Sequence, residues 1–184
     1  LVGFSMGSWL APIAAWIGPA LILRYSRDHK VGRGYLLVLG ACILAVFIGN
    51  GAFFPFFPLP LRVSIVVGYG LLLSLPYLAT RLVSSQLQGF SSTLIFPLAA
   101  TALEFVNNQT NPLGAWTMAG FTQYGNLPLM QLASVTGTIG ITFLMGWFAS
   151  VANWSWENRR RGGEMLRGLA AFGVVLAAVF IFGF

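Results

Sequence analysis

The chain has 184 residues, of which 57% are hydrophobic and 8% are charged, and its formal net charge is +6. A soluble domain of this size could not bury so much apolar surface, so the composition indicates a single domain whose solvent is lipid. One histidine and one cysteine cannot form a zinc site, and the positive charge flanks hydrophobic segments in a pattern that disfavours nucleic-acid binding. We therefore expect no metal, no cofactor and no nucleic-acid partner.

Six hydrophobic segments follow one another along the chain, and each reaches or approaches the length of a membrane-spanning helix. A bilayer core requires roughly 20 mainly apolar residues per helix. The predicted spans cover residues 3–23, 34–49, 61–80, 93–106, 129–154 and 166–184. The segments predict an all-α fold over residues 1–184, a polytopic transmembrane helix bundle of about six spans with an interfacial outer loop.

The basic residues lie mainly in three connections between the predicted spans. Nine of the ten occupy these connections: Arg24, Arg27, Lys30, Arg33, Arg81, Arg159, Arg160, Arg161 and Arg167. Only Arg62 flanks the opposite ends of the spans. Loops rich in Lys and Arg remain on the cytoplasmic side of a membrane. The charge pattern therefore predicts that residues 53–60, the loop 107–128 and the C-terminal end all face outward.

Several polar positions are candidates for chemistry. Glu104 is the only acidic residue inside a predicted span, and an ionisable group there is usually functional or paired. Two interpretations are open for Glu104: a functional group at the outer membrane surface, or a structural group that reaches water or binds the backbone. In the fifth span, Gln131, Thr136 and Thr142 lie among apolar residues. Gly137 and Gly140 in that span favour close helix packing.

The uncharged loop 107–128 combines Asn, Gln and Gly residues with aromatic side chains. Its neutral hydrogen-bonding groups could orient an ester or a phosphate without the cost of a buried charge. Alternatively, this is a re-entrant or interfacial loop whose amides satisfy its own backbone.

The sequence contains no recognisable set of catalytic residues. Cys42 lies within an apolar run without a polar neighbour that could activate its thiol, so we interpret it as a packing residue. Asp28 and His29 adjoin each other in a basic connection, which indicates a solvated turn. From the residues alone, the prediction is a polytopic membrane domain with a polar, aromatic outer loop.

The segment 96–154 resembles the membrane domain of bacterial apolipoprotein N-acyltransferases. The resemblance depends on the order and spacing of these elements: Pro97, Glu104, Trp116, Gly120-Phe121-Thr122-Gln123, Pro128, Gln131, Gly137, Gly140 and Phe143. Trp9-Leu10-Ala11-Pro12 and Leu23-Arg24 fit more loosely. Two departures indicate a divergent branch whose acyl acceptor is open. Asn107 replaces a common arginine, and Leu113-Gly114-Ala115-Trp116 replaces Gly-Phe-Pro-Trp.

The resemblance implies a bacterial inner-membrane protein in which the helix bundle precedes a periplasmic carbon–nitrogen hydrolase (nitrilase-like) domain. In that family, a Glu-Lys-Cys triad takes an acyl chain from a phospholipid and passes it to the N-terminal cysteine amine of a lipoprotein. Because this chain lacks the triad, we expect it to be a fragment that is inactive alone, with the catalytic domain after residue 184. One family helix is expected before residue 1.

Under this interpretation the helices anchor the catalytic domain and form part of a lipid-facing cleft. Glu104, Trp116, Gln123 and Tyr124 are predicted to line its outer mouth, with Gln131 behind them. The expected partners are a membrane phospholipid and a lipoprotein substrate. The alternative is a non-enzymatic transporter or scaffold. A transporter is disfavoured because the charges cluster at the ends of the spans, not near the bilayer midplane.

Overall fold

The computed structural model describes residues 11–50, 54–84, 86, 87, 89–111 and 118–184, and it confirms the all-α prediction because no strand occurs within these ranges. The α-helices are α1 (Pro12–Asp28), α2 (Val31–Gly49), α3 (Leu59–Val83), α4 (Ile95–Thr110), α5 (Leu127–Gln131), α6 (Ala133–Thr136), α7 (Thr138–Glu157) and α8 (Gly162–Gly183). Short 3₁₀ helices are η2 (Phe54–Phe56), η3 (Gly89–Leu94) and η5 (Ala119–Gln123).

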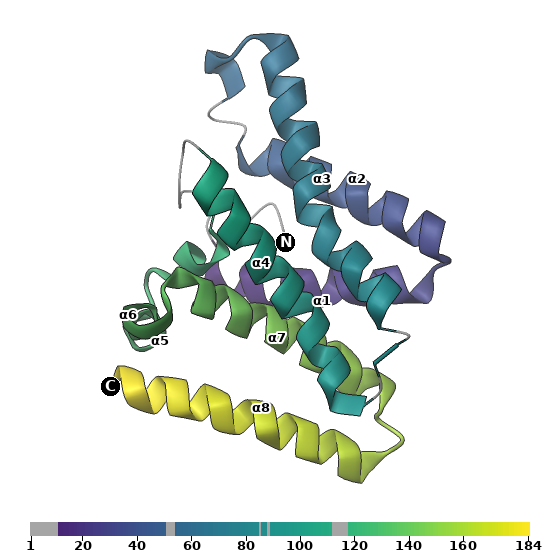
Figure 1. Ribbon diagram of the computed structural model, residues 1–184, viewed down its shortest axis with the longest axis vertical. Coiled ribbons are helices and arrows are strands. Elements are labelled where there is room, and N and C mark those ends of the chain that lie inside the picture. The colour runs from purple at the N-terminus through teal and green to yellow at the C-terminus, as the bar shows by residue number, and fades with distance from the viewer. Residues whose placement is uncertain (1–10, 51–53, 85, 88, 112–117) are drawn as a thin grey trace.

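The helices are arranged around α7, which carries the largest share of buried residues. Figure 1 shows the α2–α3 pair on one side of the molecule, α1, α4 and α7 in the middle, and α8 along the opposite side. Helix α7 packs against α1, α4 and α8, and α3 packs against α2 and α4. Leu144 and Val151 of α7 join a core cluster with Leu129 of α5 and Phe172 of α8. The fold is thus a bundle with a central helix.

Four helical segments of the described ranges are long and apolar enough to cross a membrane: Val31–Gly49, Leu59–Val83, Gly89–Thr110 and Gly162–Gly183. They coincide with the predicted second, third, fourth and sixth spans. The first predicted span, 3–23, falls partly on α1, and its residues 3–10 lie outside the described part of the chain. Helix α1 has 17 residues, one fewer than the 18 required here of a membrane-spanning helix. The chain is therefore an integral membrane helix bundle, and its described residues contain four helical segments that could cross a membrane, or five if the bent pair described next is counted.

The predicted fifth span, 129–154, is not one straight helix. Residues 127–136 and α7 are bent by 117° relative to each other, and the break lies at Gly137. Gly137 has a φ of 66°, in the left-handed region that glycine adopts without steric cost. A Cβ at Gly137 would meet no atom within 4 Å. The packing role predicted for Gly137 is therefore wrong, since this residue forms a hinge.

Helix α5, the first of the two short helices before the hinge, lies against the end of α8. A Cβ built on Gly183 would come within 2.0 Å of the Pro128 carbonyl oxygen, so α8 and α5 make a close backbone approach there. Asn126 caps α5 by accepting a hydrogen bond from the Leu129 N–H, at 3.3 Å. This arrangement places the α5–α6 segment beside the C-terminal end of α8.

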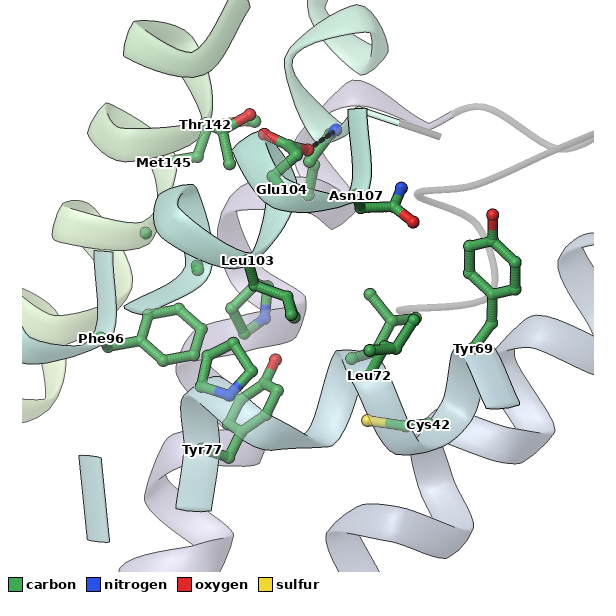
Figure 2. Close-up of a pocket in the computed structure, with 17 residues that line it drawn as sticks. Cys42, Tyr69, Leu72, Tyr77, Phe96, Leu103, Glu104, Asn107, Thr142 and Met145 are labelled. Carbon is green, nitrogen blue, oxygen red and sulfur yellow. Dashed lines mark hydrogen bonds between the residues drawn. The ribbon is translucent and has the colours of Figure 1, made fainter. Parts of the chain in front are cut away.

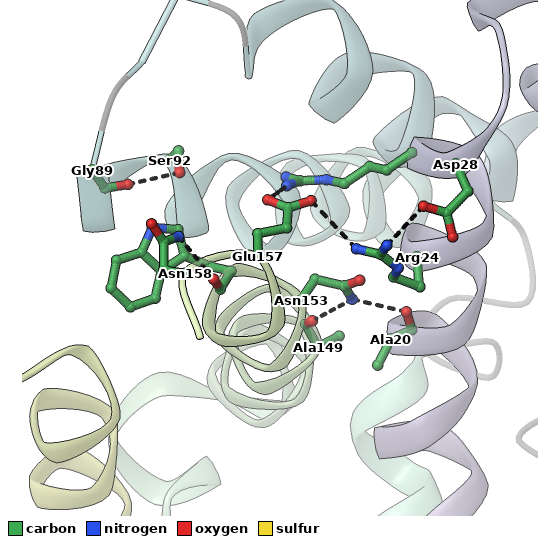
Figure 3. A network of polar contacts seen from close by, with 11 residues as sticks. Ala20, Arg24, Asp28, Gly89, Ser92, Ala149, Asn153, Glu157 and Asn158 are labelled. Atoms are coloured by element: carbon green, nitrogen blue, oxygen red, sulfur yellow. Dashed lines mark hydrogen bonds and ion pairs between the residues drawn. The ribbon is translucent and has the colours of Figure 1, made fainter. Parts of the chain in front are cut away.

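The opposite end of the bundle is held by ion pairs and backbone contacts (Figure 3). Arg27 and Arg24 of α1 approach Glu157 of α7 at 2.5 and 3.8 Å, and Arg24 also pairs with Asp28 at 2.8 Å. The Arg81 guanidinium donates to the His29 carbonyl at 2.6 Å and so brings the end of α3 to the same place. The contacts thus bring three of the basic connections together. We call this end, with the nine basic residues named above, the basic rim.

Candidate functional site

A cavity of about 150 Å³ lies among α1, α2, α3, α4 and α7 (Figure 2). Most of its wall is apolar, and small residues keep the space open. The lining residues are Ala15, Pro19, Cys42, Tyr69, Leu72, Leu73, Pro76, Tyr77, Phe96, Ala100, Leu103, Glu104, Asn107, Ala119, Thr142, Met145 and Gly146. Figure 2 shows Glu104, Asn107 and Tyr69 toward one end and the rings of Tyr77 and Phe96 toward the other.

Helix packing explains why a space remains between these elements. A Cβ on Gly146 would come within 3.2 Å of Pro97, so α4 and α7 are in close contact along one wall. On the other wall, a Cβ on Gly70 would come within 2.9 Å of the Ile43 Cα, so α2 and α3 are equally close. The Tyr77 and Phe96 rings, with centroids 4.9 Å apart, join the two walls at one end. The cavity lies between two tight helix pairs.

Glu104 stands at the polar end of the cavity and binds η5, which lies within the predicted outer loop 107–128. Its Oε1 accepts a hydrogen bond from the Ala119 backbone N–H at 2.5 Å. Its Oε2 is buried and has no hydrogen-bond partner within the described residues. The carboxylate therefore attaches η5 to α4 and keeps one oxygen with unused acceptor capacity, so the functional and the structural interpretation both remain open.

Gln123 attaches the other end of η5 to α1. Its side chain is 3% exposed. Its Oε1 accepts from the Trp16 indole N–H at 3.1 Å, and its Nε2 donates to the Pro12 carbonyl at 3.0 Å. In addition, the Gly120 N–H donates to Thr142 Oγ1 of α7 at 3.0 Å. We call these contacts, together with the Glu104–Ala119 bond, the η5 clamp.

The predicted site residues do not all meet at one place. Glu104 is the one among them that lines the cavity, and Gln123 belongs to the η5 clamp without reaching the cavity wall. Tyr124 is 80% exposed, and Gln131 is exposed on α5. Trp116 falls on residues 112–117, outside the described residues. The structure thus separates the half-buried Glu104 and the buried Gln123 from two surface residues.

Four polar residues at the cavity were absent from the predicted site: Tyr69, Tyr77, Asn107 and Thr142. Asn107 is three residues after Glu104, a spacing that places both on one face of a helix, and this signal was available in the sequence. The Asn111 side chain donates to the Tyr69 hydroxyl and links the C-terminal end of α4 to the middle of α3. That pair is separated by 42 residues, and no local pattern predicts it.

Cys42 is buried, with 1% of its surface exposed, and its side chain forms part of the cavity wall. It is the single cysteine of the chain. The cavity residues around it are apolar, so the site offers shape and a polar end for a ligand and no group that activates the thiol. The arrangement is suited to binding an elongated apolar molecule that carries a polar group.

Comparison with known proteins shows that this chain matches one protein family. Residues 1–151 match the family described as apolipoprotein N-acyltransferase N-terminal domain. Among curated proteins, an apolipoprotein N-acyltransferase from Geobacter metallireducens is 38% identical over 58 residues. That segment is 32% of this chain and 11% of the relative, so the likeness covers a small part of the relative's length. No solved structure matches.

Proposed function

The chain belongs to the family of apolipoprotein N-acyltransferase N-terminal domains, and on that premise we propose that it is the membrane domain of an N-acyltransferase. The full protein would take an acyl chain from a membrane phospholipid and form an amide with the N-terminal cysteine amine of a lipoprotein. The name of the Geobacter relative supports this acceptor. We place the protein in the bacterial inner membrane, with the C-terminal end of α8 on the outer side.

In this proposal the nucleophile belongs to a carbon–nitrogen hydrolase domain that follows α8, since Cys42 is enclosed by apolar side chains. The membrane domain has two tasks: it anchors the catalytic domain, and it forms part of a cleft that presents the phospholipid. The α5–α6 segment, which packs on the end of α8, is the part of this chain nearest to that connection.

The cavity is the observation that carries the lipid-binding role. Hydrocarbon tails gain little hydrophobic free energy by leaving a bilayer for an apolar cavity, because lipid is already an apolar solvent. The cavity would therefore act by position: its apolar wall fixes one acyl chain, and the polar end at Glu104 and Asn107 fixes the ester and headgroup. Correct placement of a reacting group can contribute a large part of a rate enhancement.

A filled cavity tests this role in the full-length enzyme. Ala100 lines the cavity on α4, whereas Ala102, two residues later, is exposed and is not part of the wall. We expect Ala100→Phe to lower acyl transfer on the order of tenfold, because the ring occupies the chain-binding space. Ala102→Phe serves as the matched control and should retain activity. The amount of phospholipid that co-purifies with each variant, measured by mass spectrometry, should fall in Ala100→Phe and reports whether the space is filled.

Both variants must insert into the membrane at the wild-type level for the comparison to count. Reduced phospholipid retention together with unchanged acyl transfer would contradict a role for the cavity in lipid presentation. If the full-length protein transfers no acyl chain to any amine, the transporter or scaffold alternative is favoured instead.

A further inference from the structure

The net charge of the protein is concentrated at one end. Nine of the ten basic residues and three of the four acidic residues belong to the basic rim or its connections. The two remaining charged residues, Arg62 and Glu104, are of opposite sign and lie toward the other end of the bundle. The three acidic residues of the rim can neutralise only a third of its nine basic side chains. The rim therefore carries the whole formal charge of +6.

The acidic residues of the rim are already engaged inside the protein. Glu157 pairs with Arg27 and Arg24, Asp28 with Arg24, and Glu164 with Arg161 at 3.7 Å. Within the described part of the chain, six basic side chains have no acidic partner: Lys30, Arg33, Arg81, Arg159, Arg160 and Arg167. The excess charge of the rim is thus available to a partner outside the protein.

The turn between α7 and α8 presents this charge at a defined depth. Trp156, the last tryptophan of α7, is 57% exposed, and the Arg159 guanidinium lies 5.0 Å above its ring. Arg160 follows and is exposed. Tryptophan side chains concentrate at the membrane–water boundary, where lipid headgroups lie. A guanidinium beside such a ring is therefore held at headgroup level, and its planar set of donors matches phosphate oxygens.

We propose that the basic rim binds the phosphate groups of anionic phospholipids, with the Trp156–Arg159–Arg160 turn as its principal contact. Charge complementarity identifies the partner, because clusters of several Lys and Arg residues next to membrane helices attract anionic lipid surfaces. A free phosphate ion offers the same oxygens to the guanidinium groups. A lipid is the better match because Trp156 and the exposed apolar residues of α8, such as Leu166 and Leu169, would contact its glycerol and acyl chains.

The test uses the full-length protein in a neutral detergent, to which phosphatidylglycerol and phosphatidylcholine with identical acyl chains are added in equal amounts. Native mass spectrometry then measures how much of each lipid stays bound. We expect preferential retention of phosphatidylglycerol, and a loss of affinity of about fivefold for each arginine removed in Arg159→Gln and in the double variant Arg159→Gln/Arg160→Gln. The preference should shrink as ionic strength rises from 0.1 M to 1 M, because the screening length falls from about 10 Å to about 3 Å.

Arg62→Gln is the charge-matched control, since it removes the same charge at the other end of the bundle, and it should leave the lipid preference unchanged. Equal retention of the two lipids by the wild type would overturn the proposal. An unchanged lipid preference in the double variant would also overturn it. Complete displacement of phosphatidylglycerol by millimolar inorganic phosphate would overturn it too, because the site would then belong to the free ion. Because Arg159 and Arg160 are exposed, a wild-type unfolding temperature is expected for both variants and confirms that they are folded.

Discussion

The two ends of the bundle hold the same pair of helices, α1 and α7, by different interactions. At the basic rim, Glu157 reaches Arg24 and Arg27 in side-chain ion pairs that are partly exposed to solvent. At the other end, the η5 clamp links α1, α4 and α7 through short hydrogen bonds in which Glu104 is the one charged participant. The end held by the η5 clamp, with its buried polar groups, should therefore contribute more to stability than the basic rim.

The physical reason is the environment of the polar groups. An exposed ion pair is screened by water and salt and contributes about 1 kcal/mol or less. A buried donor or acceptor that loses its partner costs about 1–3 kcal/mol, because water cannot replace the lost hydrogen bond. Three substitutions, taken from the largest expected effect to the smallest, test this difference between the two ends.

The largest effect is expected for Gly120→Ala in η5. A Cβ at this position would lie 2.5 Å from the backbone oxygen of Thr138, so the backbone must shift to accept it. We expect a loss of about 3 kcal/mol in the free energy of unfolding, measured by denaturant titration in detergent. Gly125→Ala is the matched control, because a Cβ there meets no atom within 4 Å. Equal stability of the two variants would mean that η5 is not tightly packed against α7.

A smaller loss is expected for Gln123→Leu. The leucine side chain is similar in size but leaves the Trp16 indole N–H and the Pro12 carbonyl without the partners they have in the wild type. We expect a loss of about 2 kcal/mol in the free energy of unfolding. Gln131→Leu makes the same change at an exposed position of α5 and should lie within about 0.5 kcal/mol of the wild type. A negligible effect of Gln123→Leu would remove the clamp as the source of stability at this end.

The smallest effect is expected at the basic rim. Glu157→Gln removes the ion pairs with Arg24 and Arg27 and should cost about 1 kcal/mol or less. This cost should decrease further in high salt, because added ions screen the pairs. Glu164→Gln, which affects a longer and more exposed pair with Arg161, is the control and should have almost no effect. A loss for Glu157→Gln that exceeds the loss for Gln123→Leu would reverse the comparison between the two ends.

The sequence predicted the four spans that the described residues contain because a bilayer imposes a local requirement, a long run of apolar residues, that hydropathy measures directly. The bend at Gly137 escaped this measure, since the run from residue 129 to 154 remains apolar on both sides of the hinge. What distinguishes the position is a backbone φ of 66°, which a count of apolar residues does not detect.

The candidate site was harder to predict because its contacts join residues that are far apart in the sequence. Gln123 was expected at the mouth of a cleft, but its amide turns inward to a partner 107 residues away in the sequence. Glu104 was found by its rarity inside an apolar span, a property that sequence alone reveals. Tyr69 is one of several tyrosines in or near apolar runs, and its contact with Asn111 depends on the packing of α3 against α4.

The confinement of charge to the ends of the bundle has an electrical consequence. From Phe105 to Trp156 the chain contains no Asp, Glu, Lys or Arg, and the basic side chains gather where the helices leave the hydrocarbon layer. A voltage across the membrane acts on a protein by moving charge through the field. Helix movements in this bundle would displace almost no charge in that direction, so its conformation should be nearly independent of the resting potential of the cell.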